Sequence, residues 1–219
     1  MTRSLDQTLD AGALPIAPAV RVGLHESLTR FGRPGPTMNA DERLAVCREA
    51  RSTPRPSVNN PGGAHWILTP AELQATRSVA HDAGGINGAL VAGWMGHGLD
   101  PFRYIEIISI VSQLSAIDHF VAGVGAPPLP LPSPVTGPPT GRLDDKAAVH
   151  TGFVPTAGRA EAPTALSALP DEQAAAMDLH EALYLSPAQM WSNEFDSPLS
   201  RPQMEFVAAR TSYLNECVY

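Results

Sequence analysis

Apolar residues recur along this chain at the three- and four-residue steps of helices, and no alternating strand pattern of any length is present. The clearest case is the stretch from Asp100 to about Ala122. Its apolar positions are Tyr104, Ile105, Ile107, Ile108, Ile110, Val111, Leu114, Ile117, Phe120 and Val121. This wide apolar face predicts a long helix that ends at Gly123 and Gly125. We expect the helix to lie at the centre of its lobe or at a subunit contact.

Two acidic residues, Glu106 and Asp118, interrupt this apolar stretch. Paired carboxylates can act as general acid and base, so a catalytic role is one interpretation. The other is that they face solvent or pair with the neighbouring Arg103 or His119. We expect the second arrangement.

Helix start signals occur at five places in the chain. Each has a side chain that can accept a hydrogen bond at the N-cap, followed by proline near the first helical position, by Glu or Gln three residues on, or by both. The five are Asn39-Ala-Asp-Glu, Thr69-Pro-Ala-Glu, Asp100-Pro-Phe-Arg, Ser186-Pro-Ala-Gln and Ser200-Arg-Pro-Gln. Together with the helical spacing they predict an all-α protein.

Proline is unusually frequent, with 22 residues, and seven of them lie between Pro127 and Pro139. Such a segment favours extended polyproline II and excludes helix or central strand. A second stretch, from His150 to Thr164, is rich in Gly, Pro, Ala and Thr. We therefore expect a helical lobe over residues 1–126, a linker over 127–163 and a second helical lobe over 164–219. Recognition of the prolines by an aromatic-lined groove is the alternative to a plain linker.

The formal net charge of −7 and the absence of a basic stripe argue against a nucleic-acid partner. No apolar run approaches the ~20 residues that span a bilayer, so no membrane partner is expected. The N-terminus does not resemble a signal peptide, because Asp6 and Asp10 precede a weakly apolar stretch that Pro15 and Pro18 interrupt. A cytoplasmic location follows by default.

The chain has two cysteines, Cys47 and Cys217, too few and too far apart for a disulfide framework or a zinc site. The seven histidines are scattered, with no pair at helical metal-binding spacing. We expect neither a metal nor a cofactor. Each cysteine is either a small buried apolar residue or a reactive thiol, and both interpretations remain open.

The segment from Leu199 to Tyr219 carries a resemblance to a known family. Glu205, Ser212, Asn215 and Cys217 follow one another there at the spacing of alkylhydroperoxidase D-like and carboxymuconolactone decarboxylase-like proteins. In that family a helix with a glutamate leads to Ser, Asn and the redox sequence Cys-x-x-Cys-x-x-x-His. Residues 98–120 and 165–190 also resemble helices of its longer, two-lobed members. The resemblance implies bundles of helices as the fold of both lobes.

The resemblance also implies a thiol-dependent peroxidase with an antioxidant role. The second cysteine of the family motif attacks the peroxide, and the first then resolves the sulfenic acid to a disulfide. By this correspondence Cys217 is the resolving thiol, Glu205 relays protons, and Tyr219 lies between the two sulfur positions and shapes the peroxide pocket. The implied partners are a hydroperoxide, a dithiol reductant protein and further copies of the chain. Twelve residues of straight helix span roughly 18 Å, so Glu205 reaches Cys217 only if the chain breaks near Asn215.

The second redox residue of the family motif would be residue 220, which the sequence does not contain. We therefore expect these 219 residues to have little peroxidase activity. A selenocysteine codon read as a stop would end the chain at this position. A nonsense mutation, a sequencing error or a deliberately chosen boundary would do the same. Two other functions remain open: a lyase of the carboxymuconolactone decarboxylase type, and a non-catalytic helical fragment that mediates oligomerisation.

Overall fold

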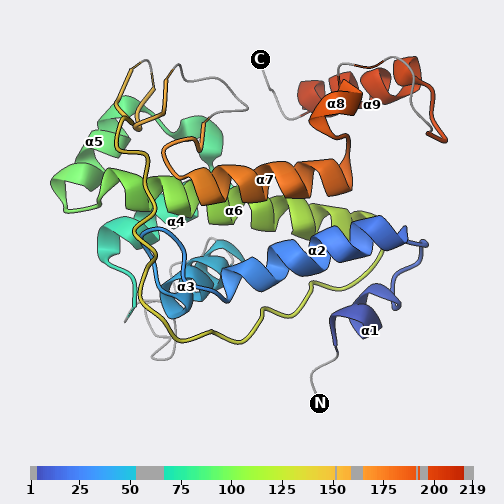
Figure 1. The fold of residues 1–219 in the computed structure, drawn as a ribbon, viewed down its shortest axis with the longest axis horizontal. Helices are drawn as coiled ribbons and strands as arrows, with labels where there is room; N and C mark the ends of the chain where they lie inside the picture. The colour runs from blue at the N-terminus through green and yellow to red at the C-terminus, as the bar shows by residue number, and fades with distance from the viewer. Residues whose placement is uncertain are drawn as a thin grey trace. The chain divides into compact units, whose positions relative to one another are not determined.

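The computed structural model describes residues 4–52, 67–150, 152–158, 165–190, 192 and 197–214 of the chain. Within these ranges the chain forms helices and no strand (Figure 1). They are α1 (Leu5–Leu9), α2 (Pro18–Phe31), α3 (Ala40–Ala50), α4 (Pro70–His81), the short 3₁₀ helix η2 (Ala83–Gly85), α5 (Gly88–Gly96), α6 (Pro101–Gly123), α7 (Pro170–Leu183), α8 (Pro187–Met190) and α9 (Arg201–Leu214). One isolated antiparallel bridge joins Ala148 to Thr156. The expected all-α fold is confirmed.

All five expected start signals lie at the beginning of a helix. Asn39 and Thr69 form complete capping boxes at α3 and α4, and the Asp100 carboxylate accepts two backbone N–H groups of α6. Ser186 and Ser200 precede α8 and α9, and the backbone N–H of each donates to the glutamine three residues on. Local sequence therefore sets where these helices begin.

α2 begins without a side-chain cap, and the sequence signals described above do not predict it. Its weakly apolar stretch was described as interrupted by proline, yet Pro18 is the first residue of the helix, where a missing N–H costs nothing. α2 buries Leu24, Leu28 and Phe31 against the rest of the fold. Proline here starts a helix and does not break one.

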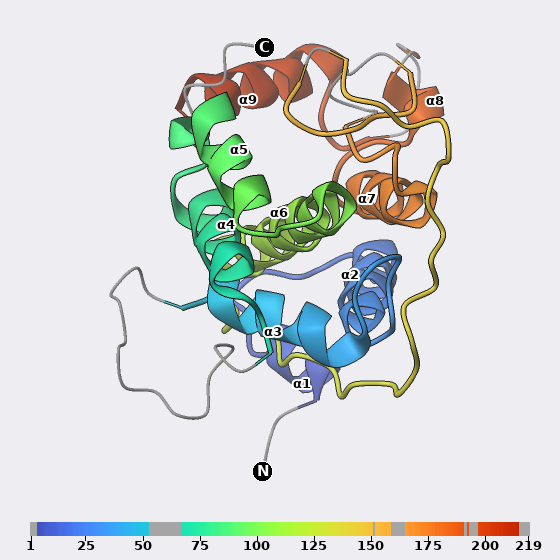
Figure 2. The same ribbon diagram turned by 90° about the vertical axis from the view of Figure 1, so that its left-hand side faces the viewer.

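The contacts divide the chain into two units, Met1–Leu183 and Tyr184–Tyr219. The lobes expected over residues 1–126 and 164–219, with a linker over 127–163, stay a prediction. In the first unit α6 is central and contacts α2, α3, α4 and α7, as the two views show (Figures 1 and 2). α7 belongs to this unit because it packs on both α2 and α6.

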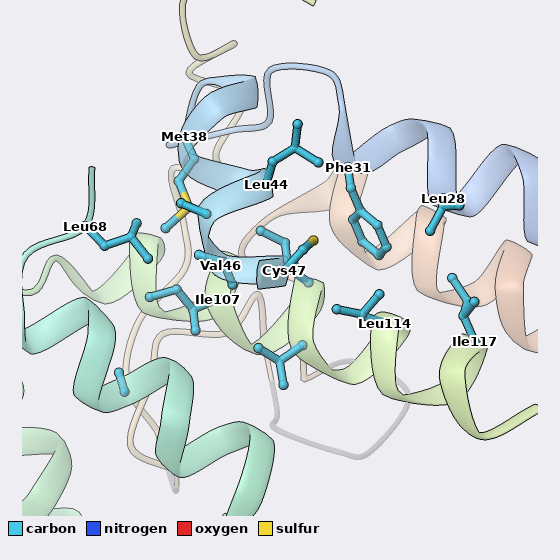
Figure 3. Packing of buried hydrophobic residues seen from close by; sticks show 14 of the residues in the cluster. Leu28, Phe31, Met38, Leu44, Val46, Cys47, Leu68, Ile107, Leu114 and Ile117 are labelled. Carbon is cyan, nitrogen blue, oxygen red and sulfur yellow. The ribbon is translucent and has the colours of Figure 1, made fainter. Parts of the chain in front are cut away.

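The hydrophobic core of the first unit surrounds α6. Figure 3 shows side chains from α2, α3 and α6 packed together, among them Phe31, Leu44 and Leu114. The second unit contains α8 and α9, and no residue of α9 is buried. The packing that holds the fold together therefore lies in the first unit.

The proline-rich segment of residues 127–141, called the proline strap below, contains neither helix nor strand. Figure 1 shows it as an extended trace that runs alongside α2. Leu129 is buried, and three backbone N–H groups of the strap donate to the loop between α2 and α3. These bonds are Val135 to the Gly32 oxygen (2.7 Å), Thr140 to the Gly35 oxygen (2.8 Å) and Gly141 to the Pro36 oxygen (3.0 Å). The strap is extended, as expected, and it is also attached to the first unit.

Among the described helices, α6 is long and apolar enough to cross a membrane by length and composition. The sequence analysis had found no such run. However, 56% of its most apolar window is buried inside the structure, as in the core helix of a soluble protein. The fold is compatible with a soluble protein.

Candidate functional site

Of the three residues expected at a redox site, the structure describes Glu205. It lies in the second turn of α9, and its carboxylate accepts from the Arg201 guanidinium at 2.6 Å. The side chain of Glu205 is 52% exposed. Cys217 and Tyr219 lie outside the described residues, and so does Asn215. Their approach to Glu205, and the break in the chain that it requires, therefore stay predictions.

Arg201 organises the start of α9. Besides Glu205, it donates to the carbonyl oxygens of Gln189 (3.2 Å) and Met190 (3.1 Å) at the end of α8. The guanidinium thus links α8 to the first turns of α9. The Glu205 carboxylate pairs with the same guanidinium, and its side chain is exposed to solvent.

Cys47 is fully buried in the core, where its sulfur lies among apolar side chains (Figure 3). Burial raises the pKa of its thiol to about 12, although Arg43, Arg51 and Arg48 act in the opposite direction. Almost none of it is thiolate at neutral pH, and the thiolate is the reactive form. Of the two interpretations left open for Cys47, the structure supports the buried apolar residue.

Glu106 occupies a different place from the one expected. Its side chain is fully buried and does not face solvent, and it pairs with Arg43 of α3, neither with Arg103 nor with His119. The second oxygen of Glu106 accepts from the Thr37 backbone N–H (2.7 Å) and hydroxyl (2.6 Å). The expectation was wrong because α3 and α7 pack on the side of α6 that carries Glu106, so this carboxylate is enclosed.

A second buried carboxylate reaches the same guanidinium. Glu172 of α7 accepts from Nη1 of Arg43 at 2.7 Å, the same nitrogen that donates to Glu106. Its other oxygen accepts from the Ser109 hydroxyl (2.6 Å), which in turn accepts from Gln113 Nε2 (2.8 Å). We call this group the Arg43 cluster: Arg43, Glu106, Glu172, Thr37, Ser109 and Gln113.

The Arg43 cluster is electrostatically unbalanced, with two carboxylates for one guanidinium. Burial raises the pKa of Glu106 and the Glu172 charge adds to this, while Arg43 and Thr37 oppose it. Burial lowers the pKa of Arg43, but the two carboxylates together raise it above its ordinary value, so it stays charged. Arg43 Nε is buried and has no hydrogen-bond partner. One nitrogen, Nη1, thus donates to both carboxylates, while Nε donates to neither.

A second arginine extends the network through Thr37. Arg103 of α6 donates to the Thr37 carbonyl oxygen (2.9 Å), to Glu42 of α3 (2.6 Å) and to Glu72 of α4. The joined network contains four carboxylates and two guanidiniums from four helices. It ties α3, α4, α6 and α7 together inside the first unit.

Asp118 is also paired differently from the expectation. It accepts two hydrogen bonds from Arg51, at 2.8 and 2.6 Å, and Arg51 also donates to the Leu129 carbonyl of the proline strap. The pair is partly exposed. Through these hydrogen bonds Arg51 connects the end of α3 to α6 and to the proline strap.

Two cavities of about 310 Å³ each adjoin these groups. The first is lined by residues that include Arg30, Arg33, Gly35, Thr140 and Glu172, and therefore borders the Arg43 cluster. The second is lined by Arg51, His81, Val111, Leu114, Ser115, Asp118, His119 and two alanines. Both are surface hollows with mixed polar and apolar walls.

The second cavity contains a serine and a histidine at hydrogen-bond distance, but the pair is not arranged for catalysis. His119 Nδ1 lies 3.2 Å from the Ser115 hydroxyl and 2.8 Å from the Ser115 carbonyl oxygen. A carbonyl can only accept, so Nδ1 carries the proton and cannot deprotonate the hydroxyl. Nor do the described residues contain a group of three His, Cys, Asp or Glu side chains able to hold a metal ion.

The Arg43 cluster is the feature that the sequence analysis missed. One signal was present: Glu106 stands between Ile105 and Ile107 on a helix that is apolar over most of its surface. A carboxylate in such a position is buried and needs a cationic partner. Nothing in the sequence indicates that this partner is Arg43, or that Glu172 shares it.

Comparisons with protein-family models, with curated proteins and with solved structures find no match for this chain.

Proposed function

We propose that the chain belongs to a thiol-dependent peroxidase of the alkylhydroperoxidase D-like type, with Cys217 as resolving thiol and Glu205 as proton relay. The observation that carries the proposal is the order and spacing of Glu205, Ser212, Asn215 and Cys217 behind the helix start at Ser200. In support, Ser200 precedes α9, and the Glu205 side chain, which pairs with Arg201, is about half exposed to solvent.

The state of the other cysteine also supports the proposal. Cys47 is buried in the core and has a raised pKa, so it is a poor candidate for reaction with a peroxide. The sequence contains two cysteines, which leaves Cys217 as the candidate redox thiol of this chain.

The proposed chemistry transfers one oxygen atom from the peroxide to sulfur. The thiolate at the second cysteine position of the family motif attacks the peroxide and cleaves its O–O bond. This thiolate becomes a sulfenic acid, and the released alkoxide takes a proton to become an alcohol. Cys217 then attacks the sulfenic sulfur, forming a disulfide and releasing water. A dithiol reductant restores both thiols and is itself oxidised to a disulfide. Glu205 accepts the thiol proton and delivers it to the departing oxygen.

The test is consumption of a hydroperoxide by the full chain in the presence of excess small dithiol, which can act as the missing thiol partner. We expect slow turnover that is lost in Cys217→Ser and retained in Cys47→Ser. Glu205→Gln should lower the rate by about tenfold or more and flatten its pH profile, because a general base is lost. Glu181→Gln, an exposed glutamate of α7, is the matched control and should behave as the unaltered chain.

Turnover in Cys217→Ser equal to that of the unaltered chain would refute the proposal. A lyase of the carboxymuconolactone decarboxylase type, the enzymatic alternative, uses a general base without a redox thiol. That function would survive Cys217→Ser, so the same variant distinguishes the two activities.

A second candidate function, contact between copies of this chain, is favoured by the surface of α9. Phe206, Tyr213 and Leu214 are 72%, 71% and 64% exposed, and no residue of α9 is buried. Exposed aromatic residues on one helix are typical of an interface. Sedimentation of the chain as a dimer or larger, and as a monomer after Phe206→Ser with Tyr213→Ser, would support this function. A monomer at all concentrations would exclude it.

A further inference from the structure

We propose that Glu106, which shares the Arg43 guanidinium with Glu172, keeps its proton in the folded protein, and that loss of this proton loosens α7 from α6. The proposal concerns the Arg43 cluster alone and does not depend on the peroxidase function.

The geometry places two carboxylate oxygens on one nitrogen. Nη1 of Arg43 donates to Oε1 of Glu106 and to Oε1 of Glu172. Arg43 Nε is buried and donates to no group, so the guanidinium does not offer each carboxylate a separate pair of donors. Both carboxylates are buried beside the same guanidinium, and two like charges near one opposite charge cannot both be ionised without cost.

The groups that face Glu106 do not balance its charge. Arg43 comes from α3, Glu172 from α7 and the uncharged Thr37 from the loop before α3. Arg103 of α6 lies beyond Thr37, where Glu42 of α3 and Glu72 of α4 already pair with it. On the side of Glu172, the adjoining cavity is also lined by Arg30 of α2, which pairs with Asp178, by Arg33 and by Asp171. The six charged side chains of the network therefore sum to two negative charges.

Water screens the charge of Glu106 weakly, because Arg43 and Glu106 are 3% and 0% exposed. A proton on Glu106 removes one negative charge from the cluster. The raised pKa of Glu106 agrees with this arrangement. Glu172 lines the adjoining cavity, which gives the proton a path to water.

Loss of the proton should act on α7 first. Glu172 lies in the first turn of α7 and is its buried charged contact with α3 and α6. When both carboxylates are ionised, their repulsion pushes the start of α7 away from α6. The loop at Gly35 and the proline strap bound to it cover the same cluster and should loosen with α7.

The direction of the pH dependence follows from the raised pKa. A carboxyl that holds its proton more tightly when folded stabilises the fold fully below the unfolded pKa of about 4.3. This stabilisation is lost as the pH rises through the raised, folded pKa. Above that point each further pH unit should increase the opening of α7 about tenfold, as expected for one proton.

The first test is infrared spectroscopy of the full chain at neutral pH, where a protonated carboxyl gives a C=O band that a carboxylate lacks. We expect this band in the unaltered chain and its absence in Glu106→Gln and in Glu172→Gln. Glu181→Gln, on the exposed side of α7, should retain the band. Absence of the band from the unaltered chain would overturn the proposal, and this result needs no folded variant.

The second test is hydrogen exchange of the α7 amides, compared with those of α4 in the same sample from about pH 6 to about pH 9. Protection of α7 relative to α4 should fall with rising pH in the unaltered chain and in Glu181→Gln. It should stay constant in Glu106→Gln, in which an amide replaces the protonated acid. A constant ratio in the unaltered chain, or an equal fall in Glu106→Gln, would contradict the proposal.

Discussion

Replacement of Gly35 by alanine tests how closely the loop between α2 and α3 covers the Arg43 cluster. A Cβ atom at this position would lie 2.9 Å from Cζ of Arg43, and closer still to Arg43 Nη1 and to Oε1 of Glu106. Ordinary van der Waals contact begins at about 3.5 Å. The ion pair would therefore have to move by about 1 Å, or the loop would have to lift away.

Each of these movements would break hydrogen bonds. Glu106 is held by two hydrogen bonds from Thr37, and the Gly35 carbonyl accepts from Thr140 of the proline strap. Overpacking of a core costs about 1–3 kcal/mol. Weakening of the buried ion pair adds to this, since complete loss of one partner costs about 3–5 kcal/mol. We expect Gly35→Ala to lower the free energy of unfolding by about 3 kcal/mol, or the melting temperature by roughly 6–12 °C.

The assay is urea unfolding followed by circular dichroism at the helix signal, with Gly93→Ala as the matched control. Gly93 lies inside α5, and a Cβ there would meet no atom within 4 Å. The same substitution should therefore stabilise the chain by about 0.5–1 kcal/mol, because alanine favours helix over glycine. If Gly35→Ala changes stability by no more than Gly93→Ala does, the close covering of the cluster is refuted.

Three further predictions follow from single contacts. Thr69→Ala should destabilise the chain by about 1 kcal/mol in urea unfolding, because it removes the hydroxyl that accepts from the Glu72 backbone N–H in the capping box, and an unchanged midpoint would contradict this. Gly23→Ala should lower the unfolding midpoint, because the new Cβ would overlap that of Ala182 on α7, and a neutral effect would mean that the two helices separate easily. At neutral pH Cys217 should be alkylated faster than Cys47, whose pKa burial raises to about 12, and the reverse order of rates would count against a reactive terminal thiol.

Much of the local structure could be predicted from the sequence. Residues near one another in the chain specify a helix start, so Asn39, Thr69 and Asp100 were identified from four-residue patterns. The α6 helix followed from the spacing of its apolar residues, and its observed range of Pro101–Gly123 agrees with the expected one. Proline content predicted the extended strap, because proline cannot continue a helix.

The tertiary structure decided which charges meet. Arg43, Glu106 and Glu172 are separated by 63 and 66 residues in the chain, and any of the other acidic residues could have been the partner of Arg43 on sequence grounds. The packing of α3, α6 and α7 selects these three and removes water from them, which raises the pKa of Glu106. Burial and pairing of charges depend on contacts between distant segments, whereas caps and helical spacing depend on neighbours within one or two turns. For this reason the sequence alone determined where α3, α4, α6, α8 and α9 begin, and only the fold determined the buried ionic network.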